Sequence, residues 1–405
     1  MTPPLSIFSI RCNLVTMRMS RHFHLAFLLG SALMILLIIN YWEDLRMLDA
    51  HPHPSFGTPK PAERQPFSQG TDSDLGERWR DEREERKEKK GVGEKTEVEW
   101  RRQEERKRRI RDVCSANGTL KFPGKFRKFD DIPNRELDHL IVDDKHKVIY
   151  CYVPKVACTN WKRVMVVLSE SLMAPDGRPY QSPQAVPIEL THNMSLYLTF
   201  SKFWRRYGRL SHHQMKVKLQ TYTKFLFVRD PFVRLISAFR NKFLQPNENF
   251  YRLFGSIMLR RYGNGDRKGN GSSRIPESAA EAFKEGIHPS FSEFVQYLLD
   301  PETERTQPFN EHWRQVYRLC HPCQIHYDFI GTLENLEEDS DQLLRILGVE
   351  DEISFPTSNR NRTSASWEHD WFAEVPDELR SKLYSLYEAD FEMFGYPKPE
   401  SLLHH

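Results

Sequence analysis

The sequence predicts an α/β fold in which helices flank a parallel sheet. Two segments carry this prediction, 148–161 and 224–237. Each runs from an apolar, β-branched or aromatic stretch, through a proline near a basic residue, into a helical pattern. A third segment, Gln324–Ile330, looks like another strand. Strands that alternate with helices form parallel sheets covered on both faces, and such sheets bind ligands at the carboxyl ends of their strands.

The first element of the chain is an apolar run over 23–42 that contains no Lys, Arg, Asp or Glu. It is long enough for an α-helix to cross a bilayer, and arginines precede it whereas acidic residues follow it. The positive-inside rule therefore predicts a signal-anchor helix, a cytosolic tail over 1–22 and a lumenal remainder, which is type II topology. A cleaved secretory signal is the alternative, disfavoured by the length of the run and the lack of a small-x-small cleavage site.

Few apolar residues occur over 43–112, where a proline-rich stretch is followed by interleaved acidic and basic residues. Such a segment cannot bury a core, so we predict a lumenal stem that is disordered or forms a single charged helix. A basic patch for an acidic polysaccharide over Arg101–Arg111 is the competing interpretation. Folded sequence begins near Cys114, which predicts one large domain over 113–405.

Composition narrows the class of protein. The chain has 405 residues and a formal net charge of +3, which argues against a nucleic-acid-binding protein. Five of its six cysteines follow the apolar run, so at least one is unpaired or shared with another chain. Cys320 and Cys323 form a C-x-x-C motif, for which a local disulfide or pairing with Cys114 is favoured over zinc. We predict no metal site. Four N-x-S/T acceptors are predicted glycosylation sites: Asn117, Asn193, Asn270 and Asn361.

The two strand–turn–helix segments share a geometry that binds anions. In the first, a lysine, a hydroxyl and free backbone N–H groups meet at a helix N-terminus, where the helix dipole favours phosphate. Thr159 and Asn160 are expected to cap this helix and to donate to phosphate. In the second, Arg229 ends a strand and Ser237 lies two helical turns beyond, so both can clamp another phosphate. An ion pair with Asp230 is the competing use of Arg229.

Over Tyr150–Trp161 and Phe225–Ser237 the chain resembles the donor-binding signature of the Golgi carbohydrate sulfotransferases. The likeness continues along the chain, through Phe309–Arg314, Leu319–Cys323, Tyr327–Glu334 and Leu386–Pro397. It implies a sulfotransferase catalytic domain with a P-loop-like sheet, and 3′-phosphoadenylyl sulfate (PAPS) as the sulfate donor. The two segments would then bind the 5′-phosphosulfate and the 3′-phosphate through Pro154, Lys155, Val156, Ala157, Cys158, Thr159, Asn160, Arg229, Asp230, Pro231, Phe232, Val233, Arg234, Leu235, Ile236 and Ser237.

Within that family, the sequence around Asp131–Asn134 and Lys202–Gly208 is similar to the chondroitin 4-O-sulfotransferase branch. The likeness implies transfer of sulfate to the 4-hydroxyl of N-acetylgalactosamine in chondroitin, with desulfated dermatan as a secondary acceptor. It also implies a protein of the Golgi membrane. N-acetylgalactosamine on N-glycans, or flanked by dermatan iduronate, is the alternative acceptor.

Sulfuryl transfer requires a cation at the departing phosphate and a base for the acceptor hydroxyl. We predict the first role for Lys155, which lies in the turn before a helix as the lysine of a P-loop does. The candidates for the base are His312 and His213, followed by Glu311, His192 and His212.

An acidic acceptor also requires a cationic surface, for which the sequence offers two clusters. Trp204, Arg205 and Arg206, with neighbouring Lys202, are the predicted acceptor-binding residues. Arg360 and Arg362 form the second cluster. Ordinary solvated surface explains either cluster equally well.

Two other classes of protein share parts of this pattern. Type II topology also fits a glycosyltransferase, but the Asp-x-Asp triplet Asp72–Asp74 falls in the predicted stem. A manganese requirement would favour that class. A non-catalytic polysaccharide-binding protein would lack affinity for PAPS, and the intact Lys155 and Arg229 argue against it.

Overall fold

The computed structural model describes residues 96–263, 275–305, 307–356 and 371–403. The chain divides into two units, Met1–Trp79 and Arg80–His405, and all described residues belong to the second. Within the described ranges, no helix combines the length and apolar character that crossing a membrane requires. Several predictions fall outside these residues, namely the cytosolic tail, the membrane span, most of the stem, and the positions Asn270, Asn361, Arg360 and Arg362.

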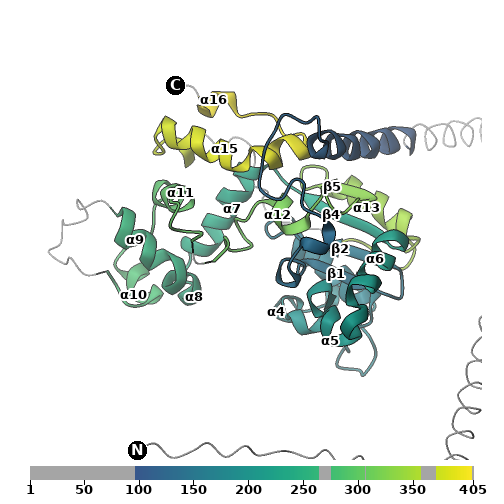
Figure 1. Cartoon of the computed structure of the whole chain (residues 1–405). Coiled ribbons are helices and arrows are strands. Elements are labelled where there is room, and N and C mark those ends of the chain that lie inside the picture. Colours follow the sequence, from purple (N-terminus) through teal and green to yellow (C-terminus); the bar gives the residue numbers. More distant parts are fainter. Residues whose placement is uncertain (1–95, 264–274, 306, 357–370, 404–405) are drawn as a thin grey trace, which may run out of the picture. The chain divides into compact units, whose positions relative to one another are not determined.

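A five-stranded mixed sheet in the order β3-β1-β2-β4-β5 carries the described fold (Figure 1). The strands β2, β4 and β5 are parallel to one another, whereas β1 pairs antiparallel with both β2 and β3. The predicted parallel sheet is therefore correct for three strands and wrong for the side formed by β1 and β3. The strands are β1 (Leu140–Asp143), β2 (Val148–Cys151), β3 (Leu198–Thr199), β4 (Thr223–Val228) and β5 (Phe329–Thr332).

Helices connect and cover these strands. The α-helices are α3 (Cys158–Leu168), α4 (Ile188–Thr191), α5 (Phe203–Tyr207), α6 (Ser211–Thr221), α7 (Pro231–Phe243), α8 (Glu248–Phe250), α9 (Ser256–Tyr262), α10 (Ala279–Lys284), α11 (Phe291–Leu299), α12 (Val316–Cys320), α13 (Leu336–Leu347), α15 (Asp377–Phe394) and α16 (Glu400–Leu403). Short 3₁₀ helices are η1 (Phe129–Asp131), η2 (Asn134–Glu136), η3 (Pro183–Ala185), η4 (Met194–Leu196), η5 (Phe200–Lys202) and η6 (Gly208–Leu210), and η7 (Tyr251–Gly255) is a π-helix.

Aromatic packing fixes α3 on the sheet. Tyr150 on β2 stacks against Phe225 on β4, with ring centroids 4.7 Å apart. Trp161 of α3 contacts both Phe225 and Phe227, each at a centroid distance of 4.9 Å. Because these rings are fully buried, the turn that joins β2 to α3 is held firmly at the carboxyl end of β2.

The third predicted strand lies further along the chain than the sequence indicated. Residues 324–328 form the turn that follows α12, where the Gln324 and Ile325 amides donate to the His321 carbonyl, each at 2.9 Å. Pairing with β4 begins only at Asp328, whose amide donates to the Lys224 carbonyl at 2.8 Å. The strand therefore starts later than predicted, because the apolar Ile325 and Tyr327 fill the core beneath the turn instead of belonging to β5.

Helical periodicity over Trp371–Phe394 predicts a C-terminal helix that packs against the sheet. Its main helix, α15, instead packs chiefly against α11, α7 and α12. Only its last turns join the sheet's core, through Ala389, Met393 and Phe394. Figure 1 shows α7 leaving the sheet toward this second group of helices, where its apolar face is buried with residues of α9, α11 and α15.

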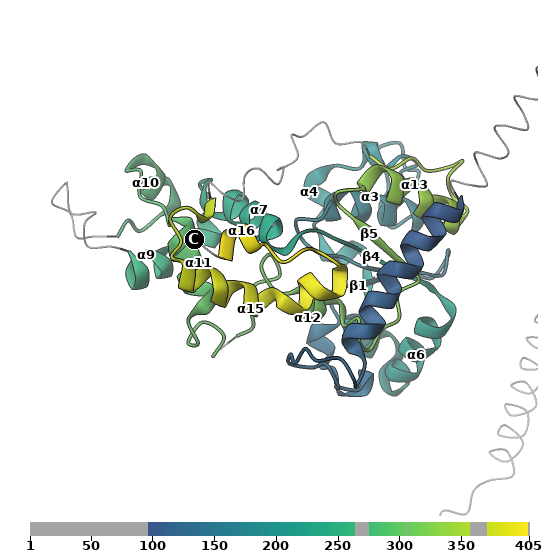
Figure 2. The ribbon, with the colours of Figure 1, turned by 90° about the horizontal axis from the view of Figure 1, so that it is seen from above.

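A helix over residues 96–114 covers the open edge of the sheet (Figure 2). The Gln103 side chain forms a matched pair of hydrogen bonds with the backbone of Ile330 on β5, at 3.1 and 3.0 Å. Arg106 donates to the buried Asp339 carboxylate at 2.9 Å. Edge strands expose unpaired backbone groups, and this helix satisfies those of Ile330 on β5. Part of the charged segment predicted as stem thus packs on the sheet.

Two disulfides join distant parts of the chain. Cys151 at the end of β2 is bonded to Cys320 at the end of α12, and Cys114 is bonded to Cys323. Of the two pairings left open for the C-x-x-C motif, the bond to Cys114 is confirmed and the local disulfide is wrong. Among the described cysteines, Cys158 is unpaired, as the odd count predicts.

Gly331 on β5 is required by a close approach of an aromatic ring. A Cβ atom at this position would overlap the ring of Phe227 on the neighbouring strand. We expect Gly331→Ala to lower the free energy of unfolding by about 1–3 kcal/mol, because the buried ring has little room to move. Chemical denaturation measures this loss. The double variant with Phe227→Leu should recover part of it, and equal losses with and without the ring would contradict the explanation.

Candidate active site

The turn between β2 and α3 forms the first half of the site. Two of its residues, Lys155 (φ 71°) and Ala157 (φ 51°), adopt left-handed backbone conformations that are costly for residues other than glycine. Ala157 is the N-cap of α3 and its side chain makes no capping bond, which leaves the amides of Cys158 and Thr159 available to an anion. The turn therefore has the geometry of an anion site, without the glycines of a Walker A loop.

Capping of α3 by Thr159 and Asn160 is therefore a wrong prediction. The Asn160 amide nitrogen Nδ2 donates instead to the Pro356 carbonyl at 2.9 Å. The Thr159 hydroxyl lies 3.2 Å from His192 Nε2. Thr159 therefore brings one of the candidate histidines to the first turn of α3.

The second half of the site begins where β4 ends. The Asp230 carboxylate accepts from the amides of Phe232 and Val233 at 2.8 and 3.0 Å and so caps α7, with Pro231 in the first helical position. Burial, together with the nearby Glu334 carboxylate, raises the pKa of Asp230 to about 6. Because this carboxylate already occupies the N-terminus of α7, an anion here must be held by side chains.

Arg229 and Ser237 are the side chains that the sequence predicted for this role. Arg229 is buried, its Nη1 lies 3.5 Å from the Lys155 carbonyl, and burial lowers its pKa. Ser237 is half-buried on α7. The apolar members of the predicted set, Phe232, Val233, Leu235 and Ile236, are core residues whose side chains pack inward.

Arg234 holds three parts of the site together. Its guanidinium is fully buried and donates to three carbonyls, those of Pro154 at 3.1 Å, Arg314 at 2.8 Å and Glu311 at 2.9 Å. It thus connects the first turn, α7 and the segment before α12. Its donors serve the protein's own backbone, rather than facing solvent.

Two lysines that were not predicted from the sequence, Lys162 and Lys242, add positive charge to the site of Lys155 and Arg229. Lys162 of α3 is buried with its Nζ 3.6 Å from the centre of the Tyr152 ring, and Lys242 of α7 lies 4.4 Å from that of Phe250. Burial lowers the pKa of both ammonium groups. Lys162 lies within α3, whereas Lys155 lies in the turn before this helix, so no helical spacing relates the two lysines.

His312 lies among these cations in a defined tautomer. Its backbone amide donates to Asn310 Oδ1 at 3.1 Å, which identifies that atom as the oxygen, and its ring Nδ1 donates to the same oxygen at 2.7 Å. Nε2 of the neutral ring is therefore the bare nitrogen. Burial, then the charges of Lys242 and Lys155, lowers the pKa of His312 to about 2.

Glu311, the preceding residue, faces a different environment. Its Oε2 accepts from the Tyr152 hydroxyl at 3.2 Å and lies 3.4 Å from His139 Nε2. It also lines a cavity of about 340 Å³ together with Asn310. One tight turn therefore presents a histidine to the cluster around Lys155 and a carboxylate to a cavity.

The remaining predicted residues lie elsewhere on the fold. His213 is exposed on α6, and its neighbour His212 has Nδ1 3.7 Å from Asp130 Oδ1. Trp204 and Arg205 are exposed on α5, which follows β3 at the sheet's edge, and Arg206 lies 3.9 Å from Asp144. Lys202 donates to backbone carbonyls, including that of Tyr197 at 2.7 Å. Asn117 and Asn193 are exposed.

No group of three or more His, Cys, Asp or Glu side chains with metal-binding geometry occurs among the described residues. A second Asp-x-Asp triplet, Asp339–Asp341, lies in α13. Asp339 there is buried and accepts from Arg106 and from the Thr332 amide, so the structure already uses this carboxylate.

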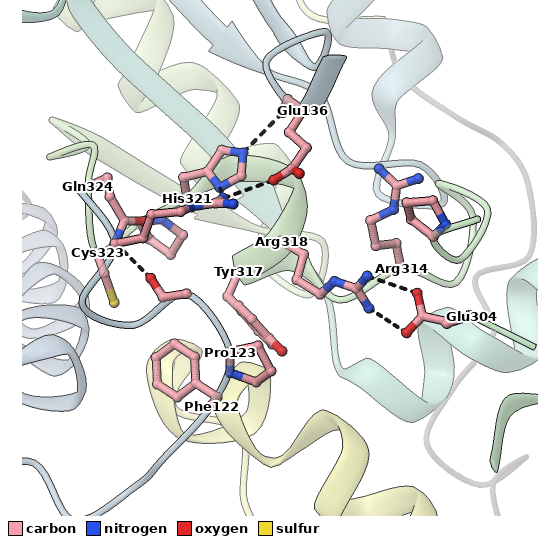
Figure 3. Close-up of a pocket in the computed structure, with 14 residues that line it drawn as sticks. Phe122, Pro123, Glu136, Glu304, Arg314, Tyr317, Arg318, His321, Cys323 and Gln324 are labelled. Carbon is pink, nitrogen blue, oxygen red and sulfur yellow. Dashed lines mark hydrogen bonds and ion pairs between the residues drawn. The ribbon is translucent and has the colours of Figure 1, made fainter. Parts of the chain in front are cut away.

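A buried histidine at a second cavity predicts a pH dependence of stability. His321 Nε2 donates to the Glu136 carbonyl at 3.0 Å, and its Nδ1 lies 3.3 Å from Arg127 Nη2, so the ring is neutral and accepts from the guanidinium (Figure 3). Burial lowers the pKa of His321 to about 4 from 6.5. Between these values the unfolded chain binds a proton that the folded chain does not, so stability falls as the pH drops from 6.5 to 4.

The matched variant is His321→Asn, because asparagine tolerates the left-handed conformation of this position (φ 49°). Unfolding free energies at pH 7 and pH 5 should differ less in the variant than in the parent, by about 1.4 kcal/mol for each unit of pKa difference abolished. His139 and His312, whose pKa values are also lowered, act in the same direction, and the raised pKa of Asp230 acts in the opposite one. An unchanged difference would exclude His321 as a contributor.

The family profile and the relatives that this chain matches are all sulfotransferases. The chain matches the profile of the sulfotransferase family over residues 138–397. It is 53% identical to carbohydrate sulfotransferase 12 of Mus musculus, over 95% of this chain and 99% of that protein. It is 62% identical to carbohydrate sulfotransferase 12 of Xenopus laevis, over 74% and 70% of the two chains. Identity to carbohydrate sulfotransferase 11 of Rattus norvegicus is 41%, over 73% and 76%. No solved structure matches the chain.

Proposed function

Because the chain belongs to the carbohydrate sulfotransferases, enzymes of the sulfotransferase family, we propose that it sulfates the 4-hydroxyl of N-acetylgalactosamine in chondroitin. PAPS is the donor that this family implies. Desulfated dermatan is the secondary acceptor in this proposal, and the enzyme is a type II protein of the Golgi membrane with its catalytic domain in the lumen. The observation that supports the donor best is the pair of anion-binding turns at the ends of the adjacent parallel strands β2 and β4.

The residues present fit a ligand with phosphates at both ends. The uncapped N-terminus of α3 and Lys155 suit a phosphosulfate, and Arg229 with Ser237 suits the second phosphate. Lys162 and Lys242 add positive charge in a partly dry environment, where each charge acts more strongly than in water. The bound donor supplies the sulfuryl group.

In the proposed mechanism, His312 takes the proton of the acceptor hydroxyl through its bare Nε2. Asn310 holds the ring in that tautomer, because a hydrogen bond from one ring nitrogen to an oxygen determines which nitrogen carries the proton. The low pKa of His312 in the free enzyme arises from burial and from surrounding cations, so an anionic ligand among those cations raises it. Lys155 stabilises the negative charge that develops on the departing phosphate oxygen.

We expect His312→Gln to lower the turnover number by about 10²-fold, because general-base catalysis contributes that much or more. The pH profile of kcat should also lose its acidic limb. Glu311→Gln is the matched control in the same turn, and we expect a smaller effect on the rate at saturating acceptor. If Glu311→Gln instead abolishes the acidic limb and His312→Gln leaves it in place, the carboxylate is the base.

The proposal as a whole is tested with radiolabelled PAPS and desulfated chondroitin, followed by disaccharide analysis of the product. Label on the 4-position of N-acetylgalactosamine supports both donor and acceptor. Label on another position, or transfer only to an N-glycan acceptor, would contradict the acceptor. A protein that binds no PAPS would contradict the donor.

A further inference from the structure

Two cavities adjoin beside the candidate active site, and neither belongs to the donor-binding turns. The proximal cavity, about 340 Å³, is lined by Asn310 and Glu311 of the catalytic turn. The distal cavity, about 310 Å³, lies next to it and reaches the turn after α12 (Figure 3). Pro308 and Arg314 line both cavities and so mark their junction. Each volume is within the range of ligand sites in proteins.

The charges in the distal cavity are unequally compensated. Arg318 forms two hydrogen bonds with the Glu304 carboxylate, at 2.9 and 2.8 Å, and Arg127 pairs with Glu136 at 2.9 Å. Among the described residues, no carboxylate lies within ion-pair distance of Arg314. Burial lowers the pKa of this guanidinium, and the more distant charges of Asp138 and Glu311 act in the opposite direction. Arg314 is therefore the cation at this junction whose charge is not matched by a direct partner in the described fold.

The geometry of Arg314 leaves its outer face for a ligand. Its Nε donates to the Phe309 carbonyl at 2.8 Å, which fixes the plane of the guanidinium. The side chain is only half-buried, and in Figure 3 its guanidinium points away from the Arg318–Glu304 pair. A guanidinium held through Nε presents its two terminal nitrogens as a fork, which matches the two oxygens of a carboxylate.

The walls of the distal cavity suit a sugar ring. Phe122 and Tyr317 meet there edge to face, with centroids 4.9 Å apart, and Pro123 lies beside them. Apolar and aromatic walls pack against the C–H face of a sugar, while the polar groups at the junction bind its substituents. A saccharide that enters from the catalytic turn therefore meets a cation first and an aromatic wall beyond it.

We propose that the two cavities hold successive sugars of the acceptor, and that Arg314 binds the carboxylate of the uronic acid next to the sulfated residue. This inference rests on the proposed function, because it places the reacting sugar at Glu311 and His312. It also moves acceptor recognition away from the exposed cluster on α5 that the sequence indicated. Arg314 is then a specificity-determining residue, because it binds the carboxylate of the uronic acid that alternates with N-acetylgalactosamine.

The test compares two acceptors and four proteins. The acceptors are desulfated chondroitin and the same polymer after chemical reduction of its carboxylates to alcohols. The proteins are the parent, Arg314→Gln, Arg314→Lys, and Arg178→Gln, which removes an exposed arginine outside the site. Melting temperatures check that Arg314→Gln remains folded without its bond to Phe309.

We expect the parent to prefer the native polymer by about 10- to 100-fold in kcat/KM, mainly through KM, because a charge-assisted bidentate bond contributes that much. Arg314→Gln should lose this preference, Arg314→Lys should keep part of it, and Arg178→Gln should keep all of it. An equal loss on both polymers would reduce Arg314 to a structural residue and overturn the inference.

Three further outcomes distinguish a failure of the carboxylate subsite from a failure of the proposed function. If the parent sulfates both polymers equally well, the proposed function stands and the carboxylate subsite is wrong. If a carboxyl-reduced polymer that carries 6-sulfates restores an Arg314-dependent preference, the anion at Arg314 is a sulfate ester rather than a carboxylate. If the folded parent sulfates neither polymer, the acceptor assignment fails and the subsite fails with it.

Discussion

Lys155→Ala is expected to lower the rate of sulfate transfer by about 10²–10³-fold, the loss typical of removing one group that stabilises developing charge. The ammonium group belongs to a turn whose backbone is held by Arg229 and Arg234, so removing the side chain leaves the donor-binding frame in place. Affinity for the desulfated donor product should fall by less than tenfold. Initial rates and calorimetric binding measure the two quantities separately.

Lys147→Ala is a closely matched control. Lys147 is also a lysine with a left-handed backbone conformation (φ 55°), and it is exposed in the turn between β1 and β2. Both substitutions place alanine at a positive φ, and so carry the same backbone cost. A full rate in Lys147→Ala together with a lost rate in Lys155→Ala would assign the effect to chemistry. Near-parent activity in Lys155→Ala would remove Lys155 from the mechanism.

Arg234→Met is expected to be the most destabilising substitution near the site. The three carbonyls of Pro154, Glu311 and Arg314 would lose their shared donor inside the fold. A buried polar group left without a partner costs about 1–3 kcal/mol, so the total loss of unfolding free energy should be on the order of 3–5 kcal/mol. Chemical denaturation measures it, and sulfate transfer should fail in parallel because the two halves of the site come apart.

Arg252→Met serves as the control, since Arg252 is an exposed arginine in the π-helix η7. Its unfolding free energy should stay within about 0.5 kcal/mol of the parent. Arg234→Lys should recover little, because one ammonium group cannot reach three carbonyls in different directions. A stable Arg234→Met variant that still binds the donor would contradict the bracing role of this arginine.

The sequence predicted those parts of the fold whose causes are local. Each donor turn combines a buried strand, a turn and a helix start within a few residues, so its type and position could be read directly. Asp230 before Pro231 is a strong helix-start signal, and α7 begins there. The central strands are buried on both faces, and such strands read as plain apolar runs.

The parts that were missed depend on contacts between distant residues. β3 contains only Leu198 and Thr199, too few residues for any pattern, and it forms because β1 lies beside it. Gln324–Ile330 looks like one strand in the sequence, yet the disulfide of Cys320 and the turn at His321 place the start of pairing at Asp328. Tertiary context overrides the local preference in both cases.

In the candidate site, too, some residues could be predicted from local motifs, whereas others depend on contacts between distant segments. Lys155 and Arg229 are recognisable because they stand within local motifs. Lys242 on α7 lies far along the chain from Glu311 and Arg314, which share one segment. The two segments are held together by Arg234, which donates to the carbonyls of Glu311 and Arg314. No pattern in the sequence encodes such a connection, because its acceptors are backbone carbonyls that every residue carries.

The arrangement of the disulfides has a consequence for how the protein is made. The partners of Cys151 and Cys114 lie 169 and 209 residues further along the chain, so neither bond can close until most of the domain has been synthesised. At roughly 5–20 residues per second, ribosomes need on the order of ten seconds or more to bridge either gap. During that interval the thiols of Cys114 and Cys151 are present without their partners, together with the thiol of Cys158, which is unpaired in the folded structure. A wrong pair formed among these thiols must be undone by thiol–disulfide exchange before both native bonds can close.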